Sequence, residues 1–373
     1  MLDINKIKLE EPTFKEFVNE SEKFADKQVI VMMSGGVDSS VTALILKEQG
    51  WNVCGVTMRI PIADKCDIKR SCCGTEAAYV ARQLDIPHYY LDVRDIFYDC
   101  VINPFQNDYK NGITPSPCVD CNESIKFGYA WDFLRSHFGI NKLATGHYAR
   151  IYSDNKGFHL GRGRDFSRDQ SYFLYGIKKD KLSDLLFPLE PYTKDETRDM
   201  ARVAGLNVAS KPDSMELCFA GEGDYRNAIG KASGRSGVIV DTSGKILGHH
   251  NAVENFTVGQ RKGLGISASH PLYVIKIDSF DNTVLVGTYE EGLTDVIRAK
   301  KINILEPEEA VKGNQLFGKI RSTGIPKSCV ISEINSEEIK VIFEEPFFMT
   351  SPGQKIVLYN KNDNIVLGAT ITL

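Results

Sequence analysis

The sequence predicts an α/β fold, in which a parallel-sheet domain with helices on both faces precedes a small central domain and a C-terminal β-barrel. In residues 26–221, apolar strands alternate with helical patterns. Residues 222–295 consist of short strands separated by Gly, Asn and Asp turns, and residues 296–373 form a second strand-rich stretch of the size of a small barrel. Alternating β and α units build parallel sheets, whereas closely spaced short strands build sandwiches or barrels.

The elements of the first domain follow from apolar periodicity. Residues 1–25 form an N-terminal extension, with Phe14, Phe17 and Val18 at helical spacing. The elements expected after it are strands at 29–33, 51–58, 88–93 and 142–148, and helices at 37–49, 74–84 and 124–138. Ligands of such sheets bind at the carboxyl ends of the strands, so we expect the active site there.

Composition excludes several classes of protein. Of the 373 residues, 42% are hydrophobic and 25% are charged, which excludes a disordered or fibrous chain. No apolar run approaches the roughly 20 residues of a membrane span, and the N-terminus lacks the pattern of a secretory signal. We therefore expect a cytoplasmic protein with no membrane partner. Nine cysteines without an export signal indicate thiol, metal or redox chemistry, not a disulfide scaffold.

The formal net charge of −4 gives no overall attraction to nucleic acid. Residues 142–181 are an exception, because they hold nine Lys or Arg against four Asp and no Glu. Such a window is either a solvated face or a local nucleic-acid contact, and charge alone does not separate the two.

The strongest local motif is S-G-G-V-D-S-S, Ser34–Ser40, between a predicted strand and a predicted helix. Its glycines and hydroxyls at a helix N-terminus form a phosphate cradle, and the lysine of a Walker loop is missing. The motif resembles that of the PP-loop family of ATP pyrophosphatases, which release pyrophosphate and transfer AMP to a substrate oxygen. The resemblance implies ATP and Mg²⁺, with Asp38 serving the metal and the pyrophosphate.

Three further cysteines stand in suggestive contexts. Cys118 and Cys121 form a C-x-x-C in T-P-S-P-C-V-D-C-N, on a proline-stiffened loop that leads into a helix. This spacing suits either thiol exchange or a soft metal. Cys218, in M-E-L-C-F-A, is from its neighbours alone either a reactive thiol or a small buried apolar residue.

Taken together, five ordered motifs make nearly the whole chain similar to the tRNA 2-thiouridylase family. They are S-G-G-V-D-S-S, A-T-G-H-Y-A, D-Q-S-Y-F-L-Y, T-V-G-Q-R-K-G-L-G-I and S-P-G-Q. The resemblance implies an ATP site lined by Met32, Ser34, Gly35, Gly36, Asp38, Ser39, Met58 and Gly146. It implies contacts to the target base or to tRNA from Ser116, Pro117, Cys118, His147, Arg168, Asp169, Gln170, Arg321, Ser322 and Gln354.

The activity that the resemblance implies is thiolation of the wobble uridine in the anticodon loop of tRNA. ATP adenylates the uracil C2 oxygen, which turns a poor leaving group into AMP. A persulfide on Cys218 then attacks C2 or releases hydrosulfide, and Cys121 forms a disulfide with Cys218. The sulfur would come from a cysteine desulfurase, directly or through a relay protein.

One position departs from the family pattern, since many members have Asp where this chain has Cys118. Three thiolates at Cys118, Cys121 and Cys218 would suit a [4Fe–4S] cluster with one open iron, an alternative to the persulfide cycle. Zinc on the same residues is a further option without obvious sulfur chemistry. A metal role for Cys66, Cys72 and Cys73 is weaker, because adjacent cysteines do not easily face one ion.

Two other functions remain open at this stage. One is a different PP-loop ligase or amide-forming enzyme, which would not need Cys121 or Cys218. The other is an RNA-binding protein that carries an Fe–S cluster without turnover, which would release no pyrophosphate or AMP in response to tRNA.

Overall fold

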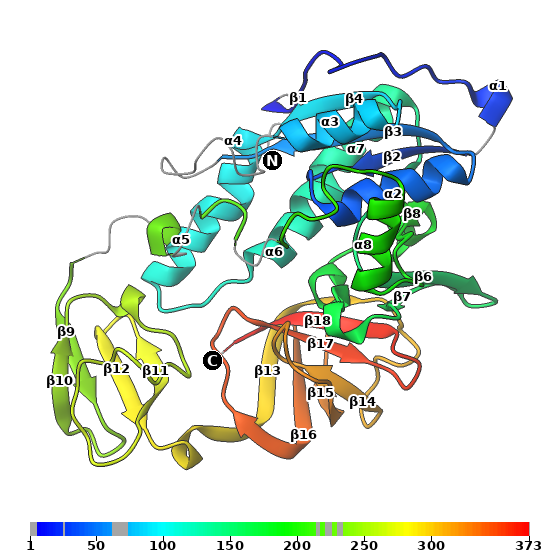
Figure 1. The fold of residues 1–373 in the computed structure, drawn as a ribbon. Helices are drawn as coiled ribbons and strands as arrows, with labels where there is room; N and C mark the ends of the chain where they lie inside the picture. Colours follow the sequence, from blue (N-terminus) through cyan, green and yellow to red (C-terminus); the bar gives the residue numbers. More distant parts are fainter. Residues whose placement is uncertain are drawn as a thin grey trace. The chain divides into compact units, whose positions relative to one another are not determined.

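A computed structural model describes residues 6–24, 27–61, 74–213, 217–220, 226–229 and 234–372. The chain divides into two compact units (Figure 1). The first unit comprises residues 1–101 and 118–225, and the second comprises residues 102–117 and 226–373. No helix in the described part of the chain is long and apolar enough to cross a bilayer.

A six-stranded sheet forms the centre of the first unit. Its order is β1 (Lys8–Leu9), β4 (His88–Asp92), β3 (Asn52–Arg59), β2 (Gln28–Met32), β5 (Lys142–Thr145) and β8 (Leu185–Leu186). All neighbours pair in parallel except β1, which runs antiparallel to β4. Val29, Ile30 and Val31 are fully buried, as expected of a parallel strand covered on both faces.

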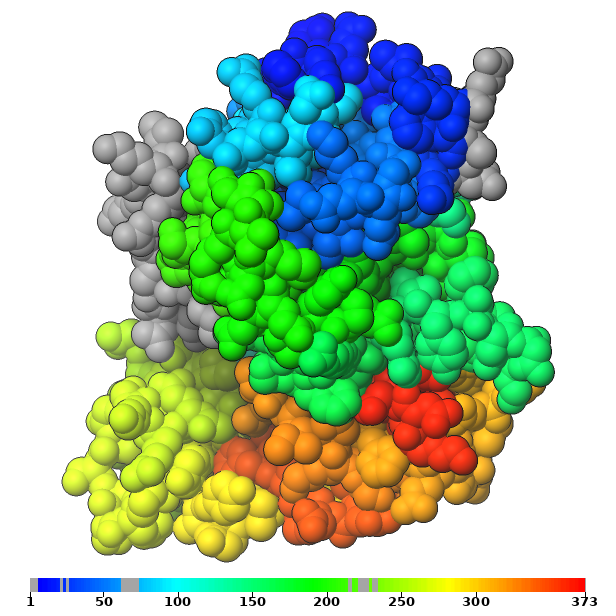
Figure 2. Space-filling model, turned by 45° about the vertical axis from the view of Figure 1, so that its right-hand side comes forward, coloured from blue at the N-terminus to red at the C-terminus, as the bar shows by residue number. Residues whose placement is uncertain are grey.

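Helices α2 (Val37–Glu48), α3 (Thr75–Gln83) and α8 (Lys194–Val203) share one apolar cluster with this sheet. Figure 2 shows the green surface that includes α8 against the blue surface of α2, with which it is in contact. The other elements of this unit are α1 (Ser21–Phe24), α4 (Arg94–Phe97), η2 (Tyr98–Ile102), α6 (Pro117–Asp120), η3 (Cys121–Ala130), α7 (Trp131–Phe138), β6 (Ala149–Asp154), β7 (Gly157–Arg162), η4 (Phe166–Arg168), η5 (Ser171–Leu174) and η6 (Lys179–Asp184).

Two local predictions were wrong. Phe14, Phe17 and Val18 do not lie in a helix, and the N-terminal extension instead supplies the edge strand β1. The helix expected at 124–138 begins at Pro117, a residue whose fixed φ suits a first helical turn. The C-x-x-C therefore lies within the helical run and not on a loop before it.

The middle of that helical run is the π-helix η3, in which hydrogen bonds span one residue more than in an α-helix. Gly128 has non-helical angles, φ −107° and ψ −111°. A Cβ at this position would lie 2.9 Å from the carbonyl oxygen of Glu123. Glycine thus permits the irregular backbone of the helix that carries Cys121.

The second unit contains a four-stranded sheet and a closed barrel, which confirms the predicted fold class. The sheet order is β10 (Ile246–His250), β9 (Gly237–Val240), β12 (Thr283–Gly287) and β11 (Tyr273–Asp278). The barrel order is β13 (Leu293–Ile304), β16 (Glu338–Phe348), β15 (Lys327–Ile334), β14 (Gln315–Lys319), β17 (Lys355–Tyr359) and β18 (Ile365–Ile371). Short helices are α5 (Asn103–Lys110), α9 (Arg226–Ile229), η7 (Val253–Asn255) and η8 (Glu290–Gly292). Barrel residues such as Val341, Ile356 and Leu367 are fully buried.

Residues 102–117 join the second unit although their sequence neighbours on both sides belong to the first. The Gln106 side chain donates to the carbonyl oxygen of Ala228 at 2.9 Å. The Thr114 amide donates to the carbonyl oxygen of Pro352, also at 2.9 Å. The chain therefore enters the second unit before Cys118 and returns to the first unit at that residue.

Candidate active site

The phosphate loop, Ser34–Ser40, lies between β2 and α2, as the sequence predicts. Gly35 has a positive φ of 75°, which glycine adopts without strain. The Ser39 hydroxyl accepts a hydrogen bond from the Ser34 amide at 3.1 Å, and the Ser40 hydroxyl donates to the Gly36 carbonyl oxygen at 2.8 Å. These bonds hold the loop open in front of the first turn of α2, where unpaired amides favour an anion.

Gly146 follows strand β5 and touches the phosphate loop. A Cβ at Gly146 would lie 2.7 Å from the carbonyl carbon of Asp38 and 2.8 Å from the Ser39 nitrogen. Only glycine permits this approach of two backbones. Gly146 therefore keeps the loop close to the end of the sheet.

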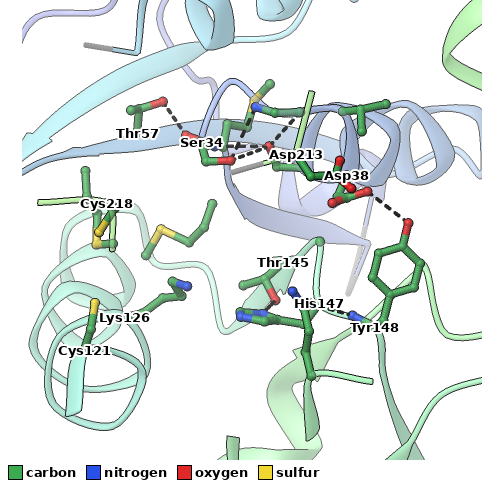
Figure 3. A pocket seen from close by; sticks show the side chains of 18 of the residues that line it. Ser34, Asp38, Thr57, Cys121, Lys126, Thr145, His147, Tyr148, Asp213 and Cys218 are labelled. Atoms are coloured by element: carbon green, nitrogen blue, oxygen red, sulfur yellow. Dashed lines mark hydrogen bonds between the residues drawn. The ribbon is translucent and has the colours of Figure 1, made fainter. Parts of the chain in front are cut away.

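A cavity of about 490 Å³ opens in front of the phosphate loop within the first unit (Figure 3). Of the residues predicted for ATP, it is lined by Met32, Ser34, Gly36, Asp38, Ser39, Met58 and Gly146. Gly35 shapes the loop but does not line the cavity. The volume lies within the range of small-molecule sites.

A charged network, not expected from the sequence, fills one side of the cavity. The Lys194 ammonium lies 2.7 and 2.8 Å from the two carboxylate oxygens of Asp38 and 2.9 Å from Asp213. Asp213 also pairs with Arg198 at 2.6 Å and with Arg168 at 3.1 Å. Burial raises the pKa of Asp213, but the hydrogen bond from Lys194 and the neighbouring cations outweigh it and hold that pKa below its usual value.

Tyr148 completes this network. Its hydroxyl donates to Asp38 at 2.9 Å and lies 3.0 Å from the Thr197 hydroxyl. Burial, followed by the charge of Asp38, raises the pKa of Tyr148, so the phenol stays protonated. A local signal for Lys194 did exist, because Thr193 and Glu196 form a capping box that places Lys194 at the first position of α8.

The structure brings Cys121 and Cys218 to the same cavity. Cys121 begins the π-helix η3 and is half-buried, whereas Cys218 is exposed. In Figure 3 both lie at one end of the cavity with Lys126, and Asp38 and Tyr148 lie at the other end. The phenyl ring of Phe219 packs against Phe97 at 5.7 Å and anchors the segment that carries Cys218.

The Cys121 thiol is protonated at neutral pH in this state. Burial raises its pKa to about 11, and the positive charge of Lys126 opposes this rise. Lys126 also lines the cavity, and its ammonium donates to the Asn122 side-chain oxygen at 2.9 Å. Sequence reasoning missed Lys126, which lies five residues after Cys121, the hydrogen-bond spacing of a π-helix.

Cys118 does not line the cavity and is exposed. Among the described residues, no three His, Cys, Asp or Glu side chains are gathered as a metal site requires. Cys118, Cys121 and Cys218 are therefore not gathered as a single zinc ion requires, and the [4Fe–4S] cluster stays a prediction. Cys66, Cys72 and Cys73 lie outside the described residues.

His147 also faces the cavity. Its Nδ1 atom lies 2.6 Å from the Thr145 hydroxyl, and its ring packs against Phe127 and Phe187. Burial, aided by the charge of Lys126, keeps the pKa of His147 well below its usual value. The imidazole is therefore neutral and suited to hydrogen bonding, not to pairing with a phosphate charge.

The other residues predicted to meet tRNA fall into two groups. Arg168 and Gln170 line the cavity, whereas the buried Asp169 does not and instead accepts bonds from Ser171 and Arg162. Those in the second unit are Ser116 and Pro117 before the C-x-x-C, Arg321 and Ser322 in the turn between β14 and β15, and Gln354 in the turn between β16 and β17.

Comparison with known proteins decides the family. Three family models match in order: a tRNA methyl transferase HUP domain over residues 27–222, a tRNA methyl transferase PRC-barrel domain over 227–288 and an aminomethyltransferase beta-barrel domain over 294–371. The tRNA-specific 2-thiouridylase MnmA 1 of Syntrophus aciditrophicus (strain SB) is 41% identical over 356 residues, covering 94% of each chain. The chain belongs to the tRNA-specific 2-thiouridylase family.

A second member of this family, MnmA 1 of Caldanaerobacter subterraneus subsp. tengcongensis, is 40% identical over 93% of this chain and 98% of its own length. Among solved structures, NMN synthetase from Francisella tularensis aligns with 53% of this chain and 69% of its own, at 14% identity and a TM-score of 0.33. Family membership thus rests on the sequence relatives, which extend over both units.

Proposed function

We propose that this chain is an ATP-dependent tRNA-uridine 2-sulfurtransferase of the wobble position. The observation that carries the proposal is that one cavity is lined by the phosphate loop and by two cysteines far apart in sequence, Cys121 and Cys218. A nucleotide-activating loop explains the first half of a thiolation, and a pair of thiols explains the second. A ligase or amide-forming enzyme of the PP-loop type would need only the first.

In the first step, the uracil C2 oxygen attacks the α-phosphorus of ATP and pyrophosphate leaves. The amides of the Ser34–Ser40 loop and the α2 N-terminus would bind the phosphates. The carboxylate of Asp38 suits Mg²⁺, which usually combines one or two carboxylates with substrate phosphates and neutralises their charge. Lys194 sits on Asp38 in this structure and is placed to move to the pyrophosphate when ATP and its metal arrive.

In the second step, the terminal sulfur of a Cys218 persulfide attacks C2, and the C2–O bond to AMP breaks. The Cys121 thiolate then attacks the inner sulfur, so that the S–S bond breaks, 2-thiouridine leaves and a Cys121–Cys218 disulfide forms. An external thiol reduces this disulfide before the next turnover. We assign Cys218 as the sulfur carrier because it is the exposed member of the pair, open to a donor protein.

The remaining parts of the proposal come from the family and from the positions of the residues. His147, Arg168 and Gln170 line the cavity where an unstacked uridine would enter, and Arg321, Ser322 and Gln354 would contact the tRNA elsewhere. The donor is a cysteine desulfurase or a relay protein, and the enzyme acts in the cytoplasm. The [4Fe–4S] cluster stays an alternative to the persulfide cycle, and no step is assigned to it.

The direct test is incubation with ATP, Mg²⁺, a persulfide donor and unmodified tRNA, followed by mass analysis of the nucleosides. We expect 2-thiouridine from the wild type and from Cys100→Ser, a half-buried cysteine outside the cavity. Neither Cys121→Ser nor Cys218→Ser should thiolate. A wild type that consumes ATP with tRNA but never forms 2-thiouridine would instead favour the ligase alternative.

A further inference from the structure

The turn between β16 and β17, residues 349–354, contains the S-P-G-Q motif and reaches the segment before the C-x-x-C. The side-chain nitrogen Nε2 of Gln354 donates to two backbone carbonyl oxygens, that of Thr114 at 3.0 Å and that of Pro115 at 3.2 Å. The Thr114 amide donates in return to the Pro352 carbonyl oxygen at 2.9 Å. All these groups belong to the second unit.

The two backbones are also in direct contact. Gly353 has a positive φ of 89°, and a Cβ there would overlap the Ile113 side chain and lie 2.9 Å from the Thr114 carbonyl oxygen. The turn itself is fixed to the barrel, because Gly353 donates to Ile371 and Ile371 donates to Gln354. The backbone of Gln354 is therefore bonded to strand β18, while its side chain is bonded to the loop at Thr114 and Pro115.

The loop at residues 113–115, which Gln354 holds, leads into the helical run that carries Cys118 and Cys121. Pro115 and Pro117 have no amide hydrogen and a fixed φ, so the orientation of this stretch depends on few hydrogen bonds. Ser116 and Pro117 are buried, and Cys118 follows immediately as the second residue of α6. Residues 114–117 thus lead directly from the loop that Gln354 holds into the first turn of α6.

We propose that Gln354 is a positioning residue that sets the start of the helix carrying Cys118 and Cys121. Both hydrogens of its amide are used on the loop carbonyls, so an RNA group would meet this side chain at Oε1, as a donor. The side chain that the family resemblance assigns to tRNA would then bind RNA and hold the cysteine helix at once. The expected loss of thiolation rests on the proposed function, whereas the expected change in the start of the helix does not.

The test compares variants that keep or remove the donor. Gln354→Glu has nearly the same shape but places an acceptor against two carbonyls, and Gln354→Lys restores a donor. Gln315→Ala removes another barrel glutamine, which bonds Ser328 and Glu344 away from the loop, and serves as the control. Amide hydrogen exchange of residues 111–118 and alkylation rates of Cys118 and Cys121, mapped by peptide mass, are measured without ATP or tRNA.

For Gln354→Glu we expect exchange in residues 111–118 to rise about fivefold or more and the alkylation rates of both cysteines to change. Gln354→Lys should move both readouts back toward wild type, and Gln315→Ala should leave them unchanged. With tRNA, the thiolation kcat of Gln354→Glu should fall more than its KM for tRNA rises. If Gln354→Glu opens the whole barrel, as exchange in β17 and β18 would show, Gln354→Met provides the donor-free variant.

The proposal is overturned if donor-free variants weaken tRNA binding while exchange and thiol reactivity remain at wild-type values. It is also overturned if Gln354→Lys behaves like Gln354→Glu. Because exchange and alkylation need no turnover, an inactive wild type would count against the proposed function and leave this test intact.

Discussion

The Lys194 ammonium lies within 2.8 Å of both carboxylate oxygens of Asp38, across 156 residues of sequence. Lys194 is only 7% exposed and also bonds Asp213. A buried lysine that neutralises the acidic residue of a phosphate loop is already positioned for incoming phosphates. Its contribution to the chemistry and to stability should therefore be measurable separately.

Lys194→Met should lower tRNA-dependent pyrophosphate release by about 100-fold, because one preorganised cation at the phosphates is lost. Asp213 keeps Arg198 and Arg168 as partners, but Asp38 loses its cation, which should cost about 2 kcal/mol of unfolding free energy, less than for a fully buried pair because Asp38 is partly exposed. Denaturant unfolding and a pyrophosphate assay measure the two effects. A loss of stability with unchanged pyrophosphate release would make Lys194 purely structural.

Lys126→Met should raise the pKa of Cys121 further above its value of about 11, since the nearby positive charge favours the thiolate. A raised pKa means less thiolate at any pH below it, so alkylation of Cys121 at pH 8 should slow by about tenfold. The pH profile of alkylation, with Lys126→Arg as the matched control, measures this. An unchanged profile would show that Lys126 does not act on the thiol.

Gly146→Ala should raise the Kd for ATP strongly, because its Cβ would overlap the backbone at Asp38 and Ser39. Gly205→Ala is the control, because its Cβ meets nothing within 4 Å and its φ of 65° strains alanine without displacing the phosphate loop. Equilibrium binding of ATP separates the two. Similar losses of affinity in both variants would mean that general destabilisation, and not loop displacement, is responsible.

Cys118→Ser should retain thiolation to within a few-fold, because Cys118 is exposed and does not line the cavity. Cys121→Ser provides the inactive comparison. Nucleoside mass analysis of 2-thiouridine is the measurement. Loss of activity in Cys118→Ser, together with loss of bound iron from anaerobically purified protein, would revive the cluster mechanism.

The parts of the site that the sequence predicted are those encoded locally. A strand, two glycines and a helix start specify the phosphate loop. The four predicted strands of the first sheet agree with β2, β3, β4 and β5 to within three residues at each end. Lys194, Tyr148 and Asp213 were not predicted, because their roles arise only where the fold brings them to Asp38. The π-helix η3 was not predicted either, because an apolar pattern does not reveal the break in helical geometry at Gly128.

The path of the chain at residues 102–117 was equally inaccessible to local patterns. Helix α5 has an ordinary amphipathic sequence, and nothing in it indicates which unit it joins. Gln106 of this helix bonds Ala228, and Thr114 after the helix bonds Pro352, in both cases more than a hundred positions later in the sequence. Only long-range packing decides this, and single-sequence periodicity carries no information about it.

The chain passes from the first unit to the second at residue 102 and returns at residue 118, so part of the second unit is synthesised before the first unit is complete. When residue 225 has emerged, the growing chain already holds the phosphate loop and both cavity cysteines, yet Phe105 and Tyr109 of α5 still await the residues that will bury them. A protein truncated at that point should carry exposed aromatic surface and a loosely held entrance to the cysteine helix. The nascent enzyme thus remains incomplete until its last strand, β18, has closed the barrel.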